Sequence, residues 1–159
     1  MNWIYTEEQR MTQWWFWLFM IGLGAIPTWG IIQQILLGKP FGNNPMPDMG
    51  LIVFAIGVYV ALFFFASIRL ITRISTNEIH VHLFPLTRRL IEWREVETAQ
   101  IVSYGFVGGY GLRISPKYGT VFNIKGRKGL ALVLKNGKKV LIGTQNPERL
   151  GEITKVTLK

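Results

Sequence analysis

The chain has 159 residues, of which 49% are hydrophobic, and it carries a formal net charge of +9 at pH 7. It contains no cysteine, which excludes a disulfide framework, a thiolate metal site and a cysteine nucleophile. The charges are segregated: 16 of the 18 basic residues and six of the nine acidic residues lie from position 69 onward, an excess of ten positive charges. Two unlike parts are therefore expected, one apolar and one basic.

Two hydrophobic runs, with no charged residue within 11–38 or 49–68, predict helices that cross a membrane. One covers residues 14–37 and the other covers residues 49–70. Each exceeds the roughly 18 to 20 residues that an α-helix needs to cross a hydrocarbon core about 30 Å thick. The first run opens with Trp14, Trp15 and Trp17, which we expect at the membrane interface because indole combines an apolar ring with a polar N–H.

The connector between these runs and the flanking charges predict the topology. Residues 38–48 are short and rich in Gly, Pro and Asn, as expected of a turn between antiparallel helices. Basic residues follow the second run, at Arg69 and Arg73, whereas the connector has only Lys39. The prediction is a multi-pass protein of the plasma membrane, with residues 1–13 as a cytoplasmic tail, both termini cytoplasmic and the connector outside.

Two other interpretations of the hydrophobic runs fit less well. A cleaved signal peptide would have a shorter apolar stretch, a basic start and a small-residue cleavage site, none of which the first run has. A buried hairpin of a soluble protein would need more covering chain than the residues that remain. A membrane-spanning hairpin is the expectation that we carry forward.

Residues 72–159 have the pattern of a small β domain. Alternation of apolar and polar residues predicts about seven short strands. The clearest signal is Asn136-Gly137 between two apolar runs, because both residues tolerate the positive φ of a two-residue hairpin turn. Asn146-Pro147-Glu148 is typical of a helix start. The expected fold is a membrane α-helical hairpin plus an all-β or α+β domain: seven antiparallel strands, in a half-open barrel or sandwich, with a C-terminal helix.

Several short stretches resemble a known family. The spacing Ile74-x4-Ile79-x-Val81-x3-Pro85 and the run Leu90-Ile91-Glu92-Trp93-Arg94-Glu95-Val96 are similar to the start of bacterial pleckstrin-homology-like domains. Residues 108–113 and 141–150 resemble small prokaryotic membrane proteins that pair two transmembrane helices with one such domain. The resemblance implies a pleckstrin-homology-like roll of seven strands and a C-terminal helix, and it carries no catalytic residue to transfer. Residues 75–77, the first hairpin loop, lack the basic residues with which eukaryotic relatives bind phosphoinositides, so that property does not carry over.

No arrangement of side chains in the sequence points to catalysis. His80 and His82 would share one face of a strand, as metal ligands can, but only Glu78 is near as a third ligand, and a solvated strand face explains them as well. The glycine-rich segment 105–111 matches no phosphate-binding motif and is interpreted as a flexible loop. The single aspartate, Asp48, lies in the connector, so no Ser-His-Asp set is available. We therefore expect no enzymatic activity, no metal and no cofactor.

The basic residues of the C-terminal domain are its strongest functional signal. Near an anionic leaflet, each Lys or Arg can contribute about 1 kcal/mol of attraction. Solubility and topology explain the same charges without a ligand, and nucleic acid is a weaker partner because the domain is tethered to the membrane. The predicted contacts with lipid or a partner are Arg69, Arg73, Arg88, Arg89, Lys125, Arg127, Lys128, Lys138 and Lys139.

Two functions from different classes follow. In the first, the chain is a non-enzymatic membrane-anchored interaction or scaffold module, whose cytoplasmic domain binds anionic lipid headgroups, a cytoplasmic protein, a peptide at an open strand edge, or its own copies. In the second, the helices form an oligomeric pore or a transport-associated subunit. Gly22, Gly24 and Thr28 offer a small-residue face for helix contacts, but no ionisable side chain lies inside either span.

Overall fold

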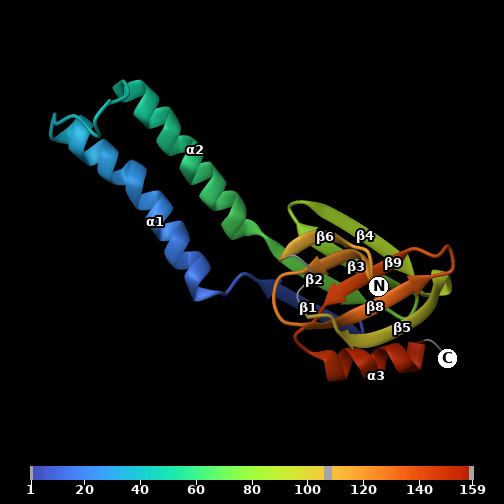
Figure 1. Cartoon of the computed structure of the whole chain (residues 1–159). Coiled ribbons are helices and arrows are strands. Elements are labelled where there is room, and N and C mark those ends of the chain that lie inside the picture. The colour runs from blue at the N-terminus through green and yellow to red at the C-terminus, as the bar shows by residue number, and fades with distance from the viewer. Residues whose placement is uncertain (1, 106–108, 158–159) are drawn as a thin grey trace. The chain divides into compact units, whose positions relative to one another are not determined.

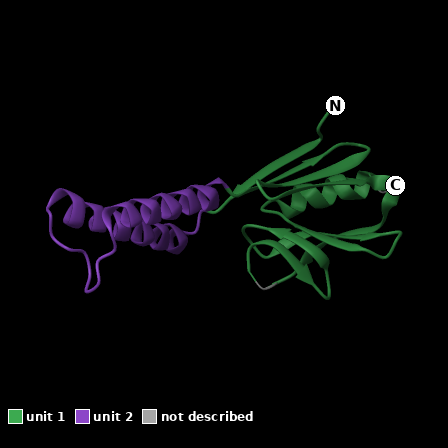
Figure 2. Cartoon of the chain, turned by 90° about the horizontal axis from the view of Figure 1, so that it is seen from above, with its two compact units in different colours: residues 1–11, 68–159 green, residues 12–67 purple. Residues whose placement is uncertain are grey.

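The computed structural model describes residues 2–105 and 109–157, and the chain divides into two compact units. Figure 1 shows the elements along the chain, and Figure 2 colours the two units separately. One unit, residues 12–67, is helical; the other combines residues 1–11 with residues 68–159 and is built of strands with one C-terminal helix. The helical unit is therefore an insertion between two segments of the β unit.

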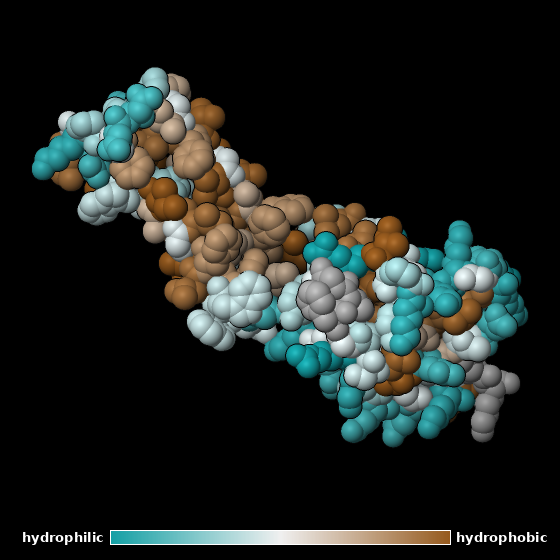
Figure 3. All heavy atoms as spheres, in the orientation of Figure 1, coloured by the Kyte–Doolittle hydropathy of each residue, from teal (hydrophilic) through white to brown (hydrophobic). Residues whose placement is uncertain are grey.

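The helical unit consists of two long helices. Helix α1 runs over Trp14–Ile31 and continues as a short π-helix over Ile32–Leu36, and α2 runs over Asp48–Ser67. Both helices are long and apolar enough to cross a membrane by length and composition, and Figure 3 shows hydrophobic side chains gathered over them. The second helix ends three residues before the predicted limit at position 70, because the chain from Arg69 onward pairs as a strand.

Polar contacts join the two helices to each other and to their connector. The Thr28 hydroxyl donates to the Gly24 carbonyl at 2.7 Å and also hydrogen-bonds to the Tyr59 hydroxyl of α2. At the connector, the Gln34 amide donates to the Met46 carbonyl at 2.8 Å and to the Asp48 carboxylate at 2.7 Å. An apolar environment offers no hydrogen-bond partners, so these bonds satisfy the polar groups within the hairpin itself. They therefore favour one geometry of the two helices.

Sheet A, the first sheet of the β unit, has four antiparallel strands in chain order, and its first strand comes from before the helices. The strands are β1 Tyr5–Arg10, β2 Arg69–Ile74, β3 Glu78–Phe84 and β4 Thr87–Glu92. Residues 1–13, predicted as a free tail, thus supply an edge strand that pairs with β2 from Tyr5↔Ile74 to Arg10↔Arg69. The prediction missed this strand because its inward side chains, Tyr5, Glu7 and Gln9, are polar or amphipathic.

Sheet B, the second sheet, has five strands in the order β5-β8-β9-β7-β6, which brings the total to nine instead of seven. Its strands are β5 Val96–Ser103, β6 Gly111–Ser115, β7 Gly119–Asn123, β8 Lys128–Leu134 and β9 Lys139–Gly143, with a 3-10 turn over Trp93–Glu95 ahead of them. The expectation of purely antiparallel strands is wrong at one place, where β7 and β9 pair in parallel. Four of the five β9 residues are buried, so β9 lies inside the sheet, and the exposed β6 takes an edge.

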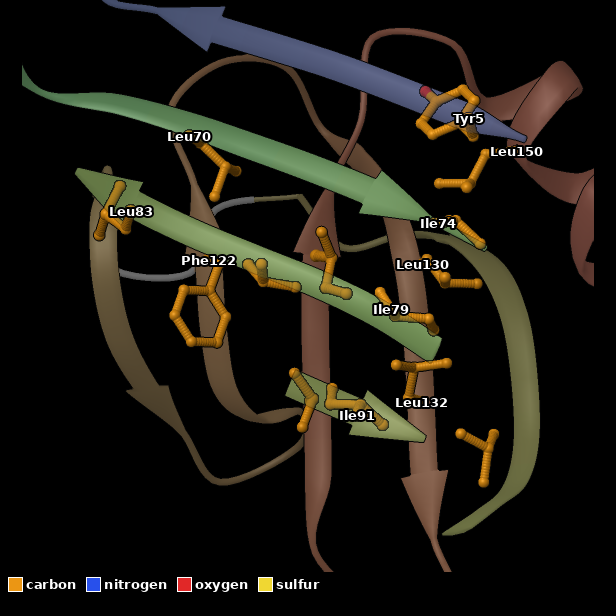
Figure 4. Packing of buried hydrophobic residues seen from close by; sticks show 14 of the residues in the cluster. Tyr5, Leu70, Ile74, Ile79, Leu83, Ile91, Phe122, Leu130, Leu132 and Leu150 are labelled. Carbon is orange, nitrogen blue, oxygen red and sulfur yellow. The ribbon is translucent and has the colours of Figure 1, made fainter. Parts of the chain in front are cut away.

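The core lies between the inner faces of the two sheets. Figure 4 shows β2 and β3 crossing over the strands of sheet B, with Leu70, Ile79 and Leu83 directed at Phe122 and Leu130. Helix α3, Pro147–Thr157, adds the fully buried Leu150 to the same cluster. Each such side chain contributes about 1.5–3 kcal/mol when it leaves water. Because this packing uses the inner face of sheet A, the outer face remains available for other contacts.

Candidate functional site

Alternation along the strands of sheet A places a set of basic residues on its outer face. The residues that alternate with the buried Leu70, Val81 and Ile91 point outward. We call this surface the basic face and define it by the outward residues of β1 to β4 that carry charge or border them. They are Thr6, Glu8, Arg10, Arg69, Ile71, Arg73, Glu78, His80, His82, Phe84, Arg88, Leu90 and Glu92.

The strand register brings these residues into rows across the sheet. Arg73 lies opposite His80, and His82 lies opposite Arg88. Arg10 lies opposite Arg69 at the last rung of the β1–β2 ladder. Side chains in such rows have Cβ atoms about 5 Å apart, so their charges act on one another and on a shared ligand.

A hollow of about 530 Å³ opens on this face. Its lining includes Arg73 from β2, His80 and His82 from β3, and Arg88 and Leu90 from β4. The apolar Ile71 of β2 also lines it, as does Arg89, which alternates to the opposite side of β4. Cationic and apolar groups from three strands therefore meet in one shallow depression.

The hollow holds its two histidines in different states of pairing. His80 Nε2 lies 2.7 Å from the Glu78 carboxylate, and the Trp3 ring packs edge-on against its imidazole at 4.8 Å. His82 Nε2 accepts a hydrogen bond of 3.2 Å from Arg88 Nε, which identifies that nitrogen as unprotonated. Burial, and then the positive charges of Arg88, Arg69 and Arg73, lower the pKa of His82 below its ordinary value.

Acidic neighbours neutralise only part of the basic face. Glu8 accepts from Arg10 at 2.7 Å and lies 3.5 Å from Arg69, and the hydrogen bond from Arg10 is the main cause of its lowered pKa. Within the described residues, no carboxylate lies within ion-pair distance of Arg73 or Arg88. The hollow therefore keeps two cationic side chains whose charge no neighbouring acid offsets.

The structure divides the predicted contact residues into two groups. Arg69, Arg73, Arg88 and Arg89 come together on or beside the basic face. The lysines and Arg127 do not line the hollow, because they belong to sheet B: Lys125, Arg127 and Lys128 to the β7–β8 connection and start of β8, and Lys138 and Lys139 to the β8–β9 hairpin. Trp14, Trp15 and Trp17 belong to the other unit, at the start of α1, with exposed side chains.

Residues on and beside the basic face that precede the helices were not predicted as part of a site. Trp3 packs on His80, with the Arg73 guanidinium 6.0 Å from its ring centroid, and Glu8 and Arg10 form the ion-paired corner of the face. The alternation of Thr6, Glu8 and Arg10 with Tyr5, Glu7 and Gln9 is the only local signal of this strand. It could not be distinguished from a polar tail.

A second polar cluster holds β1 against sheet B. The buried Glu7 carboxylate accepts from the Thr144 hydroxyl and from the Gln145 backbone N–H, each at 2.6 Å, and from the Tyr5 hydroxyl and the Gln9 amide. Burial, and then the hydrogen bond to Glu7, raise the pKa of Tyr5 to about 12. This cluster fixes the edge strand that completes the basic face.

The other predicted features remain separate from the basic face. Within residues 2–105 and 109–157, no group of three or more His, Asp or Glu residues could hold a metal ion. Residues 106–108 of the glycine-rich segment lie outside the described residues. The strand edge predicted beside the helix is β5, which forms with α3 a hollow lined by Ile101, Gly151 and Lys155.

Comparison with known proteins adds no family to this geometry. A scan against protein-family models finds no match, and a search of curated proteins finds none either. Function is therefore inferred from the residues of the chain itself.

Proposed function

We propose that the chain is a membrane-anchored, non-enzymatic binding module whose basic face binds anionic lipid headgroups of the cytoplasmic leaflet. The observation that carries this proposal is the pairing of Arg10 with Arg69 at the rung next to both chain connections to the helices. Arg10 precedes the first residue of α1 by four positions, and Arg69 follows the last residue of α2 by two.

Chain length limits how far these arginines can lie from the lipid. A residue spans at most about 3.5 Å, so Arg10 lies within about 14 Å, and Arg69 within about 7 Å, of a helix end. If both helices cross the bilayer, these distances keep the corner of the basic face near the headgroup layer. Each cation near an anionic surface contributes about 1 kcal/mol, and this attraction weakens with salt.

The topology proposed for the chain is the one predicted from its charges. Both helix ends that connect to the β unit emerge on one side of the membrane, because α1 and α2 form a hairpin with a short connector. The excess of basic residues from position 69 onward favours the cytoplasmic side for the β unit. The chain is thus proposed to be a multi-pass protein of the plasma membrane with both termini in the cytoplasm.

We also propose that the β unit is a pleckstrin-homology-like roll. Two packed sheets closed by the C-terminal helix α3 support this assignment. The described residues depart from the simple seven-stranded pattern by having nine strands, of which β1 is one addition, and by the parallel pairing of β7 with β9. The departure at β1 is the functional one, because it ties the sheet to both ends of the helical insertion.

Lipid retention by the full chain tests the proposed function. The protein is purified in a neutral detergent with an equal mixture of phosphatidylcholine and phosphatidylglycerol, and the bound lipids are identified by native mass spectrometry. The test variant combines Arg69→Gln, Arg73→Gln and Arg88→Gln. The matched control removes the same charge from sheet B through Lys135→Gln, Lys138→Gln and Lys139→Gln.

The native chain and the sheet B control are expected to retain phosphatidylglycerol in preference to phosphatidylcholine. The basic-face variant is expected to lose that preference, because its remaining charges are not concentrated beside the helix ends. Equal retention of both lipids by the native chain would contradict the proposal. Equal losses in the two variants would mean that net charge, and not the basic face, selects the lipid.

A further inference from the structure

The hollow on the basic face has the lining expected of a site for one specific anionic group. We propose that it binds a phosphate monoester group through Arg73 and Arg88, beside His82. This inference rests on the proposed function, because it names the chemical group that the basic face selects. It goes beyond the proposed function because it requires a defined pocket. General attraction of the basic face to an anionic membrane would not require one.

The backbone places the two arginines on opposite sides of the strand that carries His82. Arg73 comes from β2 and Arg88 from β4, on either side of the β3 strand that carries His82. Strands β2 and β4 are about 10 Å apart, because each neighbouring pair is separated by about 4.8 Å. Arg73 pairs with His80 and Arg88 with His82, so the two arginines are also offset by two residues along the strands. Two arginine side chains that line the same hollow can reach across that distance to a ligand over β3.

The hydrogen bonds already present prepare these groups for an anion. Arg88 uses its Nε to donate to His82, which orients the guanidinium. Arg73 lies over the Trp3 ring, its Cζ 6.0 Å from the ring centroid. Glu78 and Glu8 are engaged with His80 and with Arg10 and Arg69. The nearest acids are therefore occupied, and an incoming anion meets two cations that have no acidic partner among the described residues.

A phosphate monoester matches this arrangement better than other common anions do. It carries about −1.5 to −2 charge at pH 7 and presents three terminal oxygens. Guanidinium groups bind such oxygens in bidentate pairs. A phosphodiester or a carboxylate carries one charge and has two free oxygens, so it leaves more of the positive field unbalanced. Ile71 and Leu90 provide apolar contact for the carbon skeleton of the ester.

The same group has two sources, a soluble phosphate ester or a lipid with a terminal phosphate, and one experiment separates them. The full chain is placed in neutral phosphatidylcholine nanodiscs with isotope-labelled histidine. Since the chain has two histidines, two imidazole environments are observed by NMR. Inorganic phosphate is added at constant ionic strength, with chloride as the reference. Separate nanodiscs contain phosphatidic acid or phosphatidylglycerol at equal negative charge.

Inorganic phosphate is expected to shift the His82 signals saturably. Arg88→Gln should weaken this binding about tenfold, because it removes a charge-assisted hydrogen-bond donor. Lys138→Gln, which removes an exposed charge from the β8–β9 hairpin, should leave it unchanged. A response to phosphate without a response to phosphatidic acid identifies a soluble ester as the ligand. A stronger response to phosphatidic acid than to phosphatidylglycerol identifies the lipid headgroup.

Two results would overturn the inference. One is the absence of a saturable His82 shift with both phosphate and phosphatidic acid. The other is an equal response to phosphatidic acid and phosphatidylglycerol with none to phosphate. The second result leaves the proposed function standing, because the face would still attract anionic lipid without selecting a phosphate monoester. The proposed function fails separately, when the native chain retains anionic and neutral lipid equally.

Discussion

The Glu7 carboxylate accepts a 2.6 Å hydrogen bond from the Thr144 hydroxyl, although 137 positions separate the two residues in the chain. Glu7 belongs to the strand that precedes the helices, and Thr144 follows β9, the most buried strand of sheet B. A buried carboxylate is costly unless donors surround it, and here two hydroxyls, an amide and a backbone N–H do so. This bond therefore ties the start of the chain to its last strand.

Replacing Glu7 should detach β1 from the rest of the β unit. Glu7→Gln replaces one acceptor oxygen with an NH₂ group, which would face the hydrogen-bond donors that now surround the carboxylate. We expect this change to lower the free energy of unfolding by about 2–3 kcal/mol. Faster amide exchange across residues 5–10 of the full chain, followed by mass spectrometry, measures the effect. The control is Glu8→Gln, one position away on the exposed side, for which at most about 1 kcal/mol is expected. Equal exchange in the two variants would show that the buried cluster does not hold the strand.

The register of β1 with β2 predicts that the helical insertion can be removed. The ladder ends at Arg10 and Arg69, and Met11 and Ile68 are the next residue on each side, so a two-residue Asn-Gly turn in place of residues 12–67 should close an ordinary β-hairpin. We expect this shortened chain to be soluble and to give dispersed amide signals in an NMR spectrum. Residues 72–159 alone, which lack β1 and half of β2, should fail to fold. A folded 72–159 fragment would mean that β1 is dispensable.

The strands that could be predicted are those with a local signal. Asn136-Gly137 does lie in the turn between β8 and β9, but the predicted two-residue turn is wrong, because the connection covers residues 135–138 and Gly137 has a positive φ of +77° whereas Asn136 does not. The predicted C-terminal helix begins at Pro147. Strand β1 lacked such a signal, because Glu7 and Gln9 face inward and form hydrogen bonds with groups far away in sequence. The parallel pairing of β7 with β9 joins two strands that are separated along the chain by β8, which no short pattern encodes.

The candidate site was predictable only in part, for the same reason. Arg69, Arg73, Arg88 and Arg89 stand out as basic residues that follow the second helix; the last three line one hollow, and Arg69 lies on the same strand as Arg73. Their partners Glu8 and Arg10 come from the other side of the helical insertion, and their register with β2 is a long-range property. From the sequence alone, the lysines of sheet B could not be distinguished from these arginines, because only the fold shows which sheet each residue belongs to.

Substitution of two glycines of α1 should affect the helical hairpin differently. A Cβ at Gly30 would lie 3.0 Å from the Phe41 ring and 3.2 Å from Leu51, whereas one at Gly22 has no neighbour within 4 Å. Gly30→Val should therefore open the hairpin, and Gly22→Val should not. Thermal stability in mild detergent, measured by size-exclusion chromatography after heating, compares the two. Because both variants place the same β-branched residue in α1, equal behaviour would mean that the Gly30 contact does not limit packing.

The lowered pKa of His82 predicts acid sensitivity of the β unit. The folded state binds the imidazole proton more weakly than the unfolded chain does, because of burial and the nearby Arg88, Arg69 and Arg73. The resulting stability is complete above the ordinary histidine pKa of about 6.5 and is lost as the pH falls through the lower pKa of the folded state.

His82→Gln is therefore expected to lose less stability than the native chain when the pH falls from about 7 to about 5. Amide exchange of β3 in the full chain provides the measurement. His80→Gln is the control, because it shows how the pH dependence of exchange changes when the other histidine of this strand is removed. If the native chain and His82→Gln respond equally to acid, the arginines do not act on His82 as inferred.

The most direct test of the central claim asks whether the basic face lies against anionic lipid. Because the chain has no cysteine, Leu90→Cys carries a fluorescent label at the hollow, and Ile114→Cys carries one on β6, where the side chain is 90% exposed. The full chain is reconstituted with lipids bearing a headgroup spin label, which quenches nearby fluorophores. We predict stronger quenching at position 90 than at 114 in phosphatidylglycerol bilayers, reduced by high salt and by phosphatidylcholine. Equal quenching at the two positions, or quenching indifferent to lipid charge and salt, would contradict a lipid-binding role for the basic face.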